Sequence, residues 1–193
     1  RLLGKHRAFS AAAAQSIVRG LAMELIDGAH DPAQLQQVWQ SLENSERAMP
    51  ELAVHAAQRL ASLGGERALV RHWLLPAWQQ MVDNPGALAG HHALKLVRAL
   101  EAGLDALDAP WLARIETAAQ ANPRDARLQY LAGMACLQRQ LWGKAQQLLT
   151  QSTQQLQDAS LRRSAWQRLA ELAEQRGDGH AAAQAWKSAA LAD

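Results

Sequence analysis

The chain is interrupted at short and regular intervals by residues that end helices or form turns. Most of these interruptions contain glycine, proline, asparagine or aspartate, which favour turns and helix ends over helix interiors. They lie at 28–32, 44–50, 64–65, 84–86, 108–110, 122–123, 140–143, 157–160 and 177–179. No connection is long enough to be a linker between domains. The spacing therefore predicts a single domain over residues 1–193, in which short elements pack as antiparallel neighbours.

Apolar residues between the interruptions recur at the spacing of an α-helix. Leu96, Leu100 and Leu104 are four residues apart, which places them on one helix face. Two further stripes are Trp142, Ala145, Leu148, Leu149, Ser152 and Leu156, and Leu161, Ala165, Leu169, Leu172 and Ala173. This spacing predicts about ten helical stretches. A helix does not need the first-turn N–H that proline lacks. We therefore predict helix starts near Pro32, Pro85, Pro110 and Pro123.

The composition favours helices and disfavours a sheet. Apolar residues make up 49 % of the chain, and alanine and leucine dominate among them, with abundant glutamine beside them. These residues lose little freedom in a helix, whereas the β-branched and aromatic residues typical of strands are sparse here. The predicted fold class is all-α.

Charge and cysteine content narrow the classes of function. The net charge is +2 and no long run of like charges occurs, so we predict no nucleic-acid partner. The basic residues that come closest to a stripe are interpreted as solvated helix faces: Arg124, Arg127, Arg162, Arg163, Arg168 and Arg176. Cys136 is the one cysteine, which excludes an intramolecular disulfide. No apolar run reaches the roughly 18 residues that a membrane-spanning helix requires.

The last third of the chain contains one pattern twice. Ala145 and Ala182 are equivalent positions, 37 residues apart. Gly133 and Ala170 are the small residues of the preceding helices, and small side chains are needed where two helices approach closely. We expect large residues to fill the holes between hairpins, namely Trp142, Trp166 and Trp186. The period is close to the roughly 34 residues of tetratricopeptide repeats.

The segment Trp166-x-x-Leu169-Ala170 resembles the signature of tetratricopeptide repeats, an aromatic residue followed by leucine and a small residue. The clearest copies span about 124–157 and 161–191. A third hairpin is indicated upstream by Ala56, Ala57, Leu60, Gly64 and Ala68. The resemblance implies a right-handed α-α superhelix of about five helical hairpins.

Residues 120–190 also resemble the C-terminal region of the proteobacterial HemY family. The likeness rests on Gly133 and Cys136 in one helix, on Leu141-Trp142-Gly143-Lys144-Ala145, and on the closing run from Leu169 to Ala182. Ala132 stands where the family has leucine. Members are inner-membrane proteins whose N-terminal transmembrane helices precede a soluble repeat domain, and they are linked to haem and porphyrin biosynthesis. The resemblance implies that this chain is the soluble domain, on the cytoplasmic side, and that the membrane segment precedes it.

The resemblance further implies a scaffold that binds proteins, with enzymes of haem biosynthesis as partners, and it is compatible with a homo-oligomer. Contact with the membrane would come only through the preceding segment. Two alternatives stay open. One is direct binding of haem or porphyrin, or an enzymatic role in tetrapyrrole metabolism; the other is a generic repeat adaptor from an unrelated pathway.

No motif for catalysis or cofactor binding is convincing in this sequence. Residues 177–182 fit G-x-G-x-x-A, but the dinucleotide fingerprint needs a strand before it, and a helix is predicted there. His91 and His92 point about 100° apart on a helix, so they do not form an i, i+4 ligand pair, and His72 is isolated in the sequence. Cys136 is interpreted as a small core residue. We predict no catalytic residue, no cofactor and no metal.

The predicted binding surface lies on the first helix of each clear repeat, because these helices line the concave face of a stacked array. It comprises Arg127, Tyr130, Met134, Leu137 and Gln138 in one repeat and Ser164, Gln167, Arg168, Glu171 and Glu174 in the next. Tyrosine and methionine beside charged residues suit the binding of a peptide or helix. The alternative is that Tyr130, Met134 and Leu137 are buried against the next hairpin.

Overall fold

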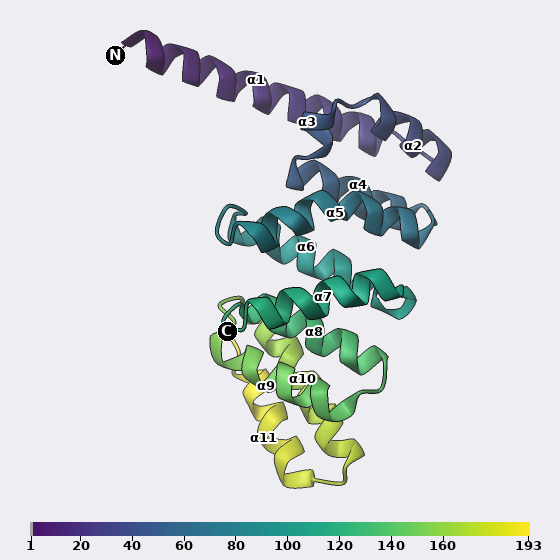
Figure 1. Cartoon of the computed structure of the whole chain (residues 1–193), viewed down its shortest axis with the longest axis vertical. Helices are drawn as coiled ribbons and strands as arrows, with labels where there is room; N and C mark the ends of the chain where they lie inside the picture. The colour runs from purple at the N-terminus through teal and green to yellow at the C-terminus, as the bar shows by residue number, and fades with distance from the viewer. Residues whose placement is uncertain (1) are drawn as a thin grey trace. The chain divides into compact units, whose positions relative to one another are not determined.

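The structure is a computed structural model that describes residues 2–193, with side chains from Ser10 onward. The described residues form α-helices, one 3-10 helix and no strand (Figure 1). The all-α prediction is thus confirmed for this part of the chain. None of the described helices combines the length and apolar character needed to cross a membrane.

The chain divides into two compact units, of which the first ends at Ala99 and the second begins at Leu100. The helices of the first unit are α1 (Leu2–Asp27), α2 (Pro32–Ser41), α3 (Asn44–Arg47), α4 (Pro50–Ser62) and α5 (Arg67–Asp83). Helix α6 (Gly90–Ala102) contains the boundary. The second unit continues with the 3-10 helix η1 (Leu104–Ala106), α7 (Ala109–Ala121), α8 (Ala126–Gln138), α9 (Trp142–Gln155), α10 (Ala159–Gln175) and α11 (Gly179–Ala190). The single domain over residues 1–193 stays a prediction.

Three hairpins close with the same turn, which follows α4, α8 and α10. In each, an N–H at the start of the next segment donates to a carbonyl five residues earlier: Gly65 to Leu60 at 2.8 Å, Leu141 to Cys136 at 2.9 Å and Asp178 to Ala173 at 3.0 Å. The residue before each donor has a positive φ, and these residues are Gly64, Gln140 and Gly177. This arrangement is the Schellman motif. The three hairpins expected from the sequence are therefore present, and the last two turns keep the 37-residue period.

Close helix packing occurs at the small residues that the sequence pattern selected. Ala145, Ala170 and Ala182 are buried. A Cβ atom on Gly133 would lie 2.8 Å from Leu149 Cγ and 3.3 Å from Leu149 N. Glycine is thus the residue that lets α8 approach α9 to this distance, and the prediction for these positions is confirmed.

Two expectations about local structure were wrong. Pro85 and Pro123 lie in turns, and the following helices begin at Gly90 and Ala126. At the second of these starts, Asp125 caps the helix by accepting a hydrogen bond from the N–H of Arg127 at 3.0 Å. The aspartate cap, not the proline, therefore fixes the first turn. Pro32 and Pro110 do occupy first turns, each behind an aspartate cap.

The prediction that tryptophans fill the holes between hairpins was also wrong for two of the three. Trp142 is 45 % exposed and Trp186 is 38 % exposed, whereas Trp166 is half-buried. Trp142 is the first residue of α9, next to the turn, where packing is incomplete. Trp186 belongs to α11, which packs against α10. Its ring lies at the edge of that contact.

Replacing Gly133 with alanine should destabilise the second unit. Overpacking a core lowers the free energy of unfolding by about 1–3 kcal/mol. The higher helix propensity of alanine than of glycine offsets only about 1 kcal/mol of this loss. The matched control is Gly143→Ala on α9, where an added Cβ meets no atom within 4 Å. Thermal unfolding followed by circular dichroism should give a lower Tm for Gly133→Ala than for the wild type. Gly143→Ala should keep or raise the Tm, and equal Tm values for the two variants would contradict the close approach.

Candidate functional site: the outward faces of α8 and α10

Two of the five residues predicted on α8 are buried, and only one is exposed. Tyr130 is 0 % exposed and its hydroxyl donates to Glu101 Oε1 at 2.8 Å, at the end of α6. Met134 is 9 % exposed, Leu137 is half-buried and Gln138 is exposed. The burial arises because η1 and α7 pack against α8. Tyr130 and Met134 therefore belong to the core of the second unit. The alternative correctly expected burial, but η1 and α7 precede α8 in the chain and are not the next hairpin.

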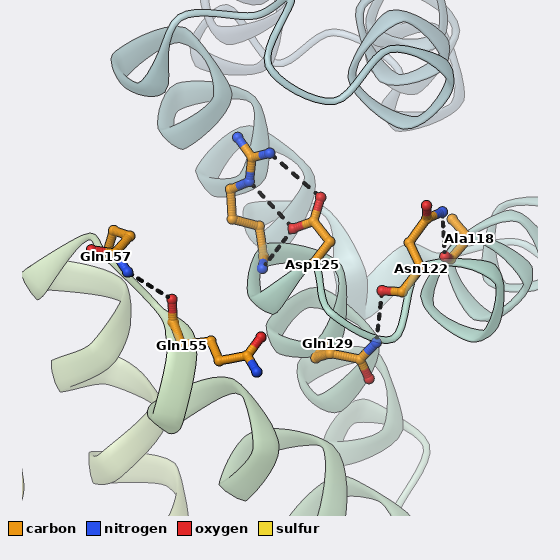
Figure 2. A network of polar contacts seen from close by, with 7 residues as sticks. Ala118, Asn122, Asp125, Gln129, Gln155 and Gln157 are labelled. Carbon is orange, nitrogen blue, oxygen red and sulfur yellow. Dashed lines mark hydrogen bonds and ion pairs between the residues drawn. The ribbon is translucent and has the colours of Figure 1, made fainter.

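Arg127 lies at the start of α8 and is held there by its neighbour. Its Nε atom is 3.4 Å from Asp125 Oδ1, and its backbone N–H donates to the same carboxylate oxygen (Figure 2). The side chain keeps 27 % of its surface exposed. Asp125 thus both caps the helix and compensates the charge of Arg127.

A buried amide that the sequence reading missed fixes the turn between α7 and α8. Gln129 is 5 % exposed and donates from Nε2 to the carbonyl oxygens of Ala119 at 2.9 Å and Asn122 at 3.3 Å. Asn122 in turn donates to the carbonyl oxygen of Ala118 at 3.0 Å (Figure 2). These bonds satisfy backbone carbonyl oxygens at the end of α7, where no further helical turn supplies N–H donors. No pattern in the sequence distinguishes Gln129 from the many exposed glutamines.

The residues predicted on α10 are more accessible than those on α8. Ser164, Gln167 and Glu171 are half-buried, and Arg168 and Glu174 are exposed. We call these five residues the α10 surface. They recur at spacings of three and four residues, which places them on one side of the helix.

Two polar contacts hold the α10 surface in a defined arrangement. Arg168 donates from Nη1 to Glu171 Oε2 at 2.5 Å, and both side chains are more than 40 % exposed. Glu174 accepts a hydrogen bond from the indole N–H of Trp186 at 2.7 Å. Trp186 therefore adds an exposed aromatic ring to the surface. The sequence reading missed this role because it placed the ring in the interior.

Two arginines at the start of α10 bind backbone carbonyl oxygens of their own unit. Arg162 donates to Leu156 at 3.2 Å and to Asp193 at 2.7 Å, and Arg163 donates to Ala192 at 2.7 Å. These bonds tie the end of the chain to the start of α10. The two arginines therefore have structural partners within the protein.

The histidines and the cysteine considered for metal or haem are spread over three helices. His72 is exposed on α5, and His91 and His92 are neighbours on α6 with ring centroids 3.8 Å apart. Cys136 is buried on α8, and burial raises the pKa of its thiol. Among the side chains from Ser10 to Asp193, no three histidine, cysteine, aspartate or glutamate residues are grouped so that they could hold a metal ion.

Of the two glycines of the G-x-G-x-x-A match, Gly177 lies in the turn between α10 and α11, and Gly179 is the first residue of α11. Gly177 has a φ of +75°, and Asp178 accepts a hydrogen bond from the N–H of Ala181 at 3.0 Å. A helix precedes the turn, as predicted, whereas a dinucleotide site requires a strand there. Gly177 therefore serves the hairpin turn, and Gly179 begins the helix that follows it.

No family model and no curated protein matches the chain. Among solved structures, the chain is similar to the MamA RS-1 ArsTM double mutant, with a TM-score of 0.51 and 17 % identity over 96 % of this chain and 92 % of that one. It is also similar to MamA AMB-1 C2221, with a TM-score of 0.44 and 17 % identity over 93 % of this chain and 98 % of that one. The first of these structures confirms the tetratricopeptide-like helical fold. At this level of identity the likeness concerns the fold alone.

His92 joins two helices of the first unit. Its Nε2 atom lies 3.1 Å from Glu51 Oε1 on α4, and its side chain is 20 % exposed. Burial lowers the pKa of His92 below 6.5, although the Glu51 carboxylate opposes this shift. The positive charges of Lys95 and Arg19 and the neighbouring His91 lower the pKa further.

The first unit should therefore lose stability in mild acid. Because the folded state lowers the pKa of His92, the unfolded chain binds this proton more tightly. The stability that neutral His92 supports is complete above pH 6.5, the unfolded pKa, and is lost as the pH falls through the folded pKa. Between about pH 7.5 and pH 5, the Tm of the wild type should fall more than that of His92→Gln, which keeps a donor for Glu51 but does not titrate.

The control for this experiment is His72→Gln, which removes an exposed histidine of the same unit. It should keep the acid sensitivity of the wild type. An equal loss of Tm in the wild type and in His92→Gln would show that His92 does not carry the effect.

Proposed function

We propose that the second unit is a protein-docking module that binds its partner through the α10 surface and Trp186, and that the chain is not an enzyme. The observation that carries the proposal is the contrast between the two equivalent faces. On α8, Tyr130 and Met134 are buried in the core, whereas on α10 the charged side chains stay accessible and are held by contacts with each other and with Trp186.

Held side chains are suited to binding because little conformational freedom is lost when a partner arrives. Tryptophan and arginine are also the residue types that contribute most to binding energy in protein interfaces. Trp186 offers an apolar ring, Arg168 offers guanidinium N–H groups beyond the one bonded to Glu171, and the two glutamates offer carboxylate oxygens. The matching partner is a peptide or helix that places an apolar side chain on the ring and charges of both signs beside it.

The identity of the partner is proposed from the resemblance of residues 120–190 to the HemY family. That resemblance supports a partner among the enzymes of haem and porphyrin biosynthesis, at the cytoplasmic side of a bacterial inner membrane. It rests on the segments around Gly133, Trp142 and Gly177 alone. The docking surface itself does not depend on which pathway supplies the partner.

A photo-crosslinking experiment tests the proposal. A photoreactive amino acid replaces Gln167 on the α10 surface, and in a second variant it replaces the exposed Gln147 on α9, outside that surface. After irradiation in cells, the Gln167 variant should give a discrete crosslinked protein that the Gln147 variant lacks. Mass spectrometry of the product then identifies the partner. If the crosslinked protein is an enzyme of tetrapyrrole metabolism, the proposed pathway is supported. If it is a different single protein, the proposed pathway is contradicted but the proposed docking surface is still supported.

Variants then connect the crosslink to the named side chains. Trp186→Ala should weaken binding of the identified partner by about 2 kcal/mol, roughly thirty-fold in Kd. Exchanging Arg168 and Glu171 keeps an ion pair at the same spacing but inverts the charge pattern, so it should weaken binding without lowering the Tm. If both positions crosslink equally, or if the partner binds Trp186→Ala as tightly as the wild type, the α10 surface is not the docking site.

A further inference from the structure

Helix α1 carries a row of large aliphatic side chains that face solvent. Ile17 is 64 % exposed, Leu21 is 57 % exposed and Leu25 is 53 % exposed. The spacing of four residues places the three side chains one above the other on one face of the helix. Val18 beside them is 38 % exposed. We call these four residues the α1 stripe, and a contiguous apolar patch of this kind marks a site of interaction.

The opposite side of α1 is attached to the rest of the first unit, so the direction of the stripe is fixed. Ala22 and Ile26 are buried. Arg19 Nη1 is 3.1 Å from Glu51 Oε2 on α4. Asp27 Oδ1 is 2.6 Å from His55 Nε2, also on α4. Turning α1 to bury the stripe against its own unit would break these contacts, and therefore the stripe stays on the outside.

The surroundings of the α1 stripe leave room for a second helix. Residues 10–16 of α1 are all exposed and consist of alanine, serine and glutamine, which present short or uncharged side chains. Ala14 and Ser10 continue the row of the stripe toward the start of the helix. In Figure 1 the N-terminal end of α1 projects past the other helices of its unit. A ridge of side chains at four-residue spacing is the element that packs into the groove of a neighbouring helix.

One charge borders the α1 stripe. Glu24 is exposed, one turn after Leu21 and next to Leu25, and among the described residues its carboxylate has no ion pair or side-chain hydrogen bond. Arg19, the nearest described cation on α1, points to Glu51 on the other side. The face is thus aliphatic with one free negative charge at its edge.

We propose that the α1 stripe binds an amphipathic α-helix of a partner protein, which carries an aliphatic ridge and a lysine or arginine placed against Glu24. A helix supplies the ridge that fits between Ile17, Leu21 and Leu25, and the cation complements the carboxylate. This site belongs to the first unit and is independent of the α10 surface.

The Glu24 carboxylate favours a basic helix over two other occupants of the α1 stripe, a second copy of this chain and a membrane surface. A second copy of the α1 stripe offers only aliphatic side chains and another glutamate, neither of which complements Glu24. An anionic membrane surface attracts lysine and arginine beside an apolar face, and here an acid occupies that place. A basic amphipathic helix satisfies both the ridge and the charge.

The test measures binding of the whole chain to two synthetic helical peptides by fluorescence anisotropy. Both peptides have leucine at the a and d positions of a heptad repeat; one has lysine and the other glutamate at the flanking e and g positions. The lysine peptide should bind the wild type more tightly than the glutamate peptide. Leu21→Gln should weaken its binding by roughly tenfold or more. The matched control is Leu191→Gln, which alters a leucine that is 70 % exposed at the end of α11 and should leave binding unchanged.

Charge reversal tests the role of Glu24 directly. Glu24→Lys should invert the preference, so that the glutamate peptide binds more tightly, while circular dichroism confirms an unchanged Tm. Absence of binding to either peptide, or equal binding to wild type and Leu21→Gln, would overturn the proposal. If neither peptide binds, two further results would also overturn the proposal. One is a dimer, detected by sedimentation, that Leu21→Gln abolishes. The other is binding to vesicles of phosphatidylcholine and phosphatidylglycerol that Leu21→Gln abolishes. The first of these results would indicate a second copy as the occupant and the second a membrane.

Discussion

The contact between Gly133 and Leu149 is the interaction on which the second unit depends. Two helix backbones can approach to this distance only where one of them has no side chain, since any Cβ on Gly133 would overlap Leu149. Ala145, Ala170 and Ala182 serve the same purpose with a single methyl group. The helices then bury their apolar stripes against one another, and the charged residues are left on the outward faces. The α10 surface is a consequence of this packing.

Much of the fold could be predicted from the sequence because it is fixed by local rules. Leu96 and Leu100 are buried on α6 as their spacing predicted, whereas Leu104 is buried in η1, after α6 has ended. The glycines at 64 and 177 have the left-handed backbone conformation that their turns require. Gln140 takes the same conformation without being glycine, since the Schellman hydrogen bonds of the α8–α9 turn require it. Pro85 and Pro123 misled the prediction because a proline is equally compatible with a turn and with a first helical turn.

The candidate site could be predicted only in part. Repeat periodicity placed the α10 surface on one side of its helix, but it could not tell which faces another element covers. Tyr130 is buried because η1 and α7 pack against α8. Neither element has a repeat signature from which this contact could have been predicted. The exposure of Trp186 and the stripe on α1 have the same origin. Each depends on which helix lies next to it in space, which spacing along the chain does not encode.

The tight fit at Gly133 has a consequence for how this protein can change over time. A larger residue at position 133 is incompatible with leucine at 149, and a smaller residue at 149 alone would leave a cavity. Neither residue can be substituted alone without a cost in stability. A paired substitution is compatible with the packing, with alanine at 133 and a shorter side chain at 149. Divergent descendants of this sequence should therefore differ at both positions or at neither, and this paired signature would identify the repeat where the tryptophans and prolines have been lost.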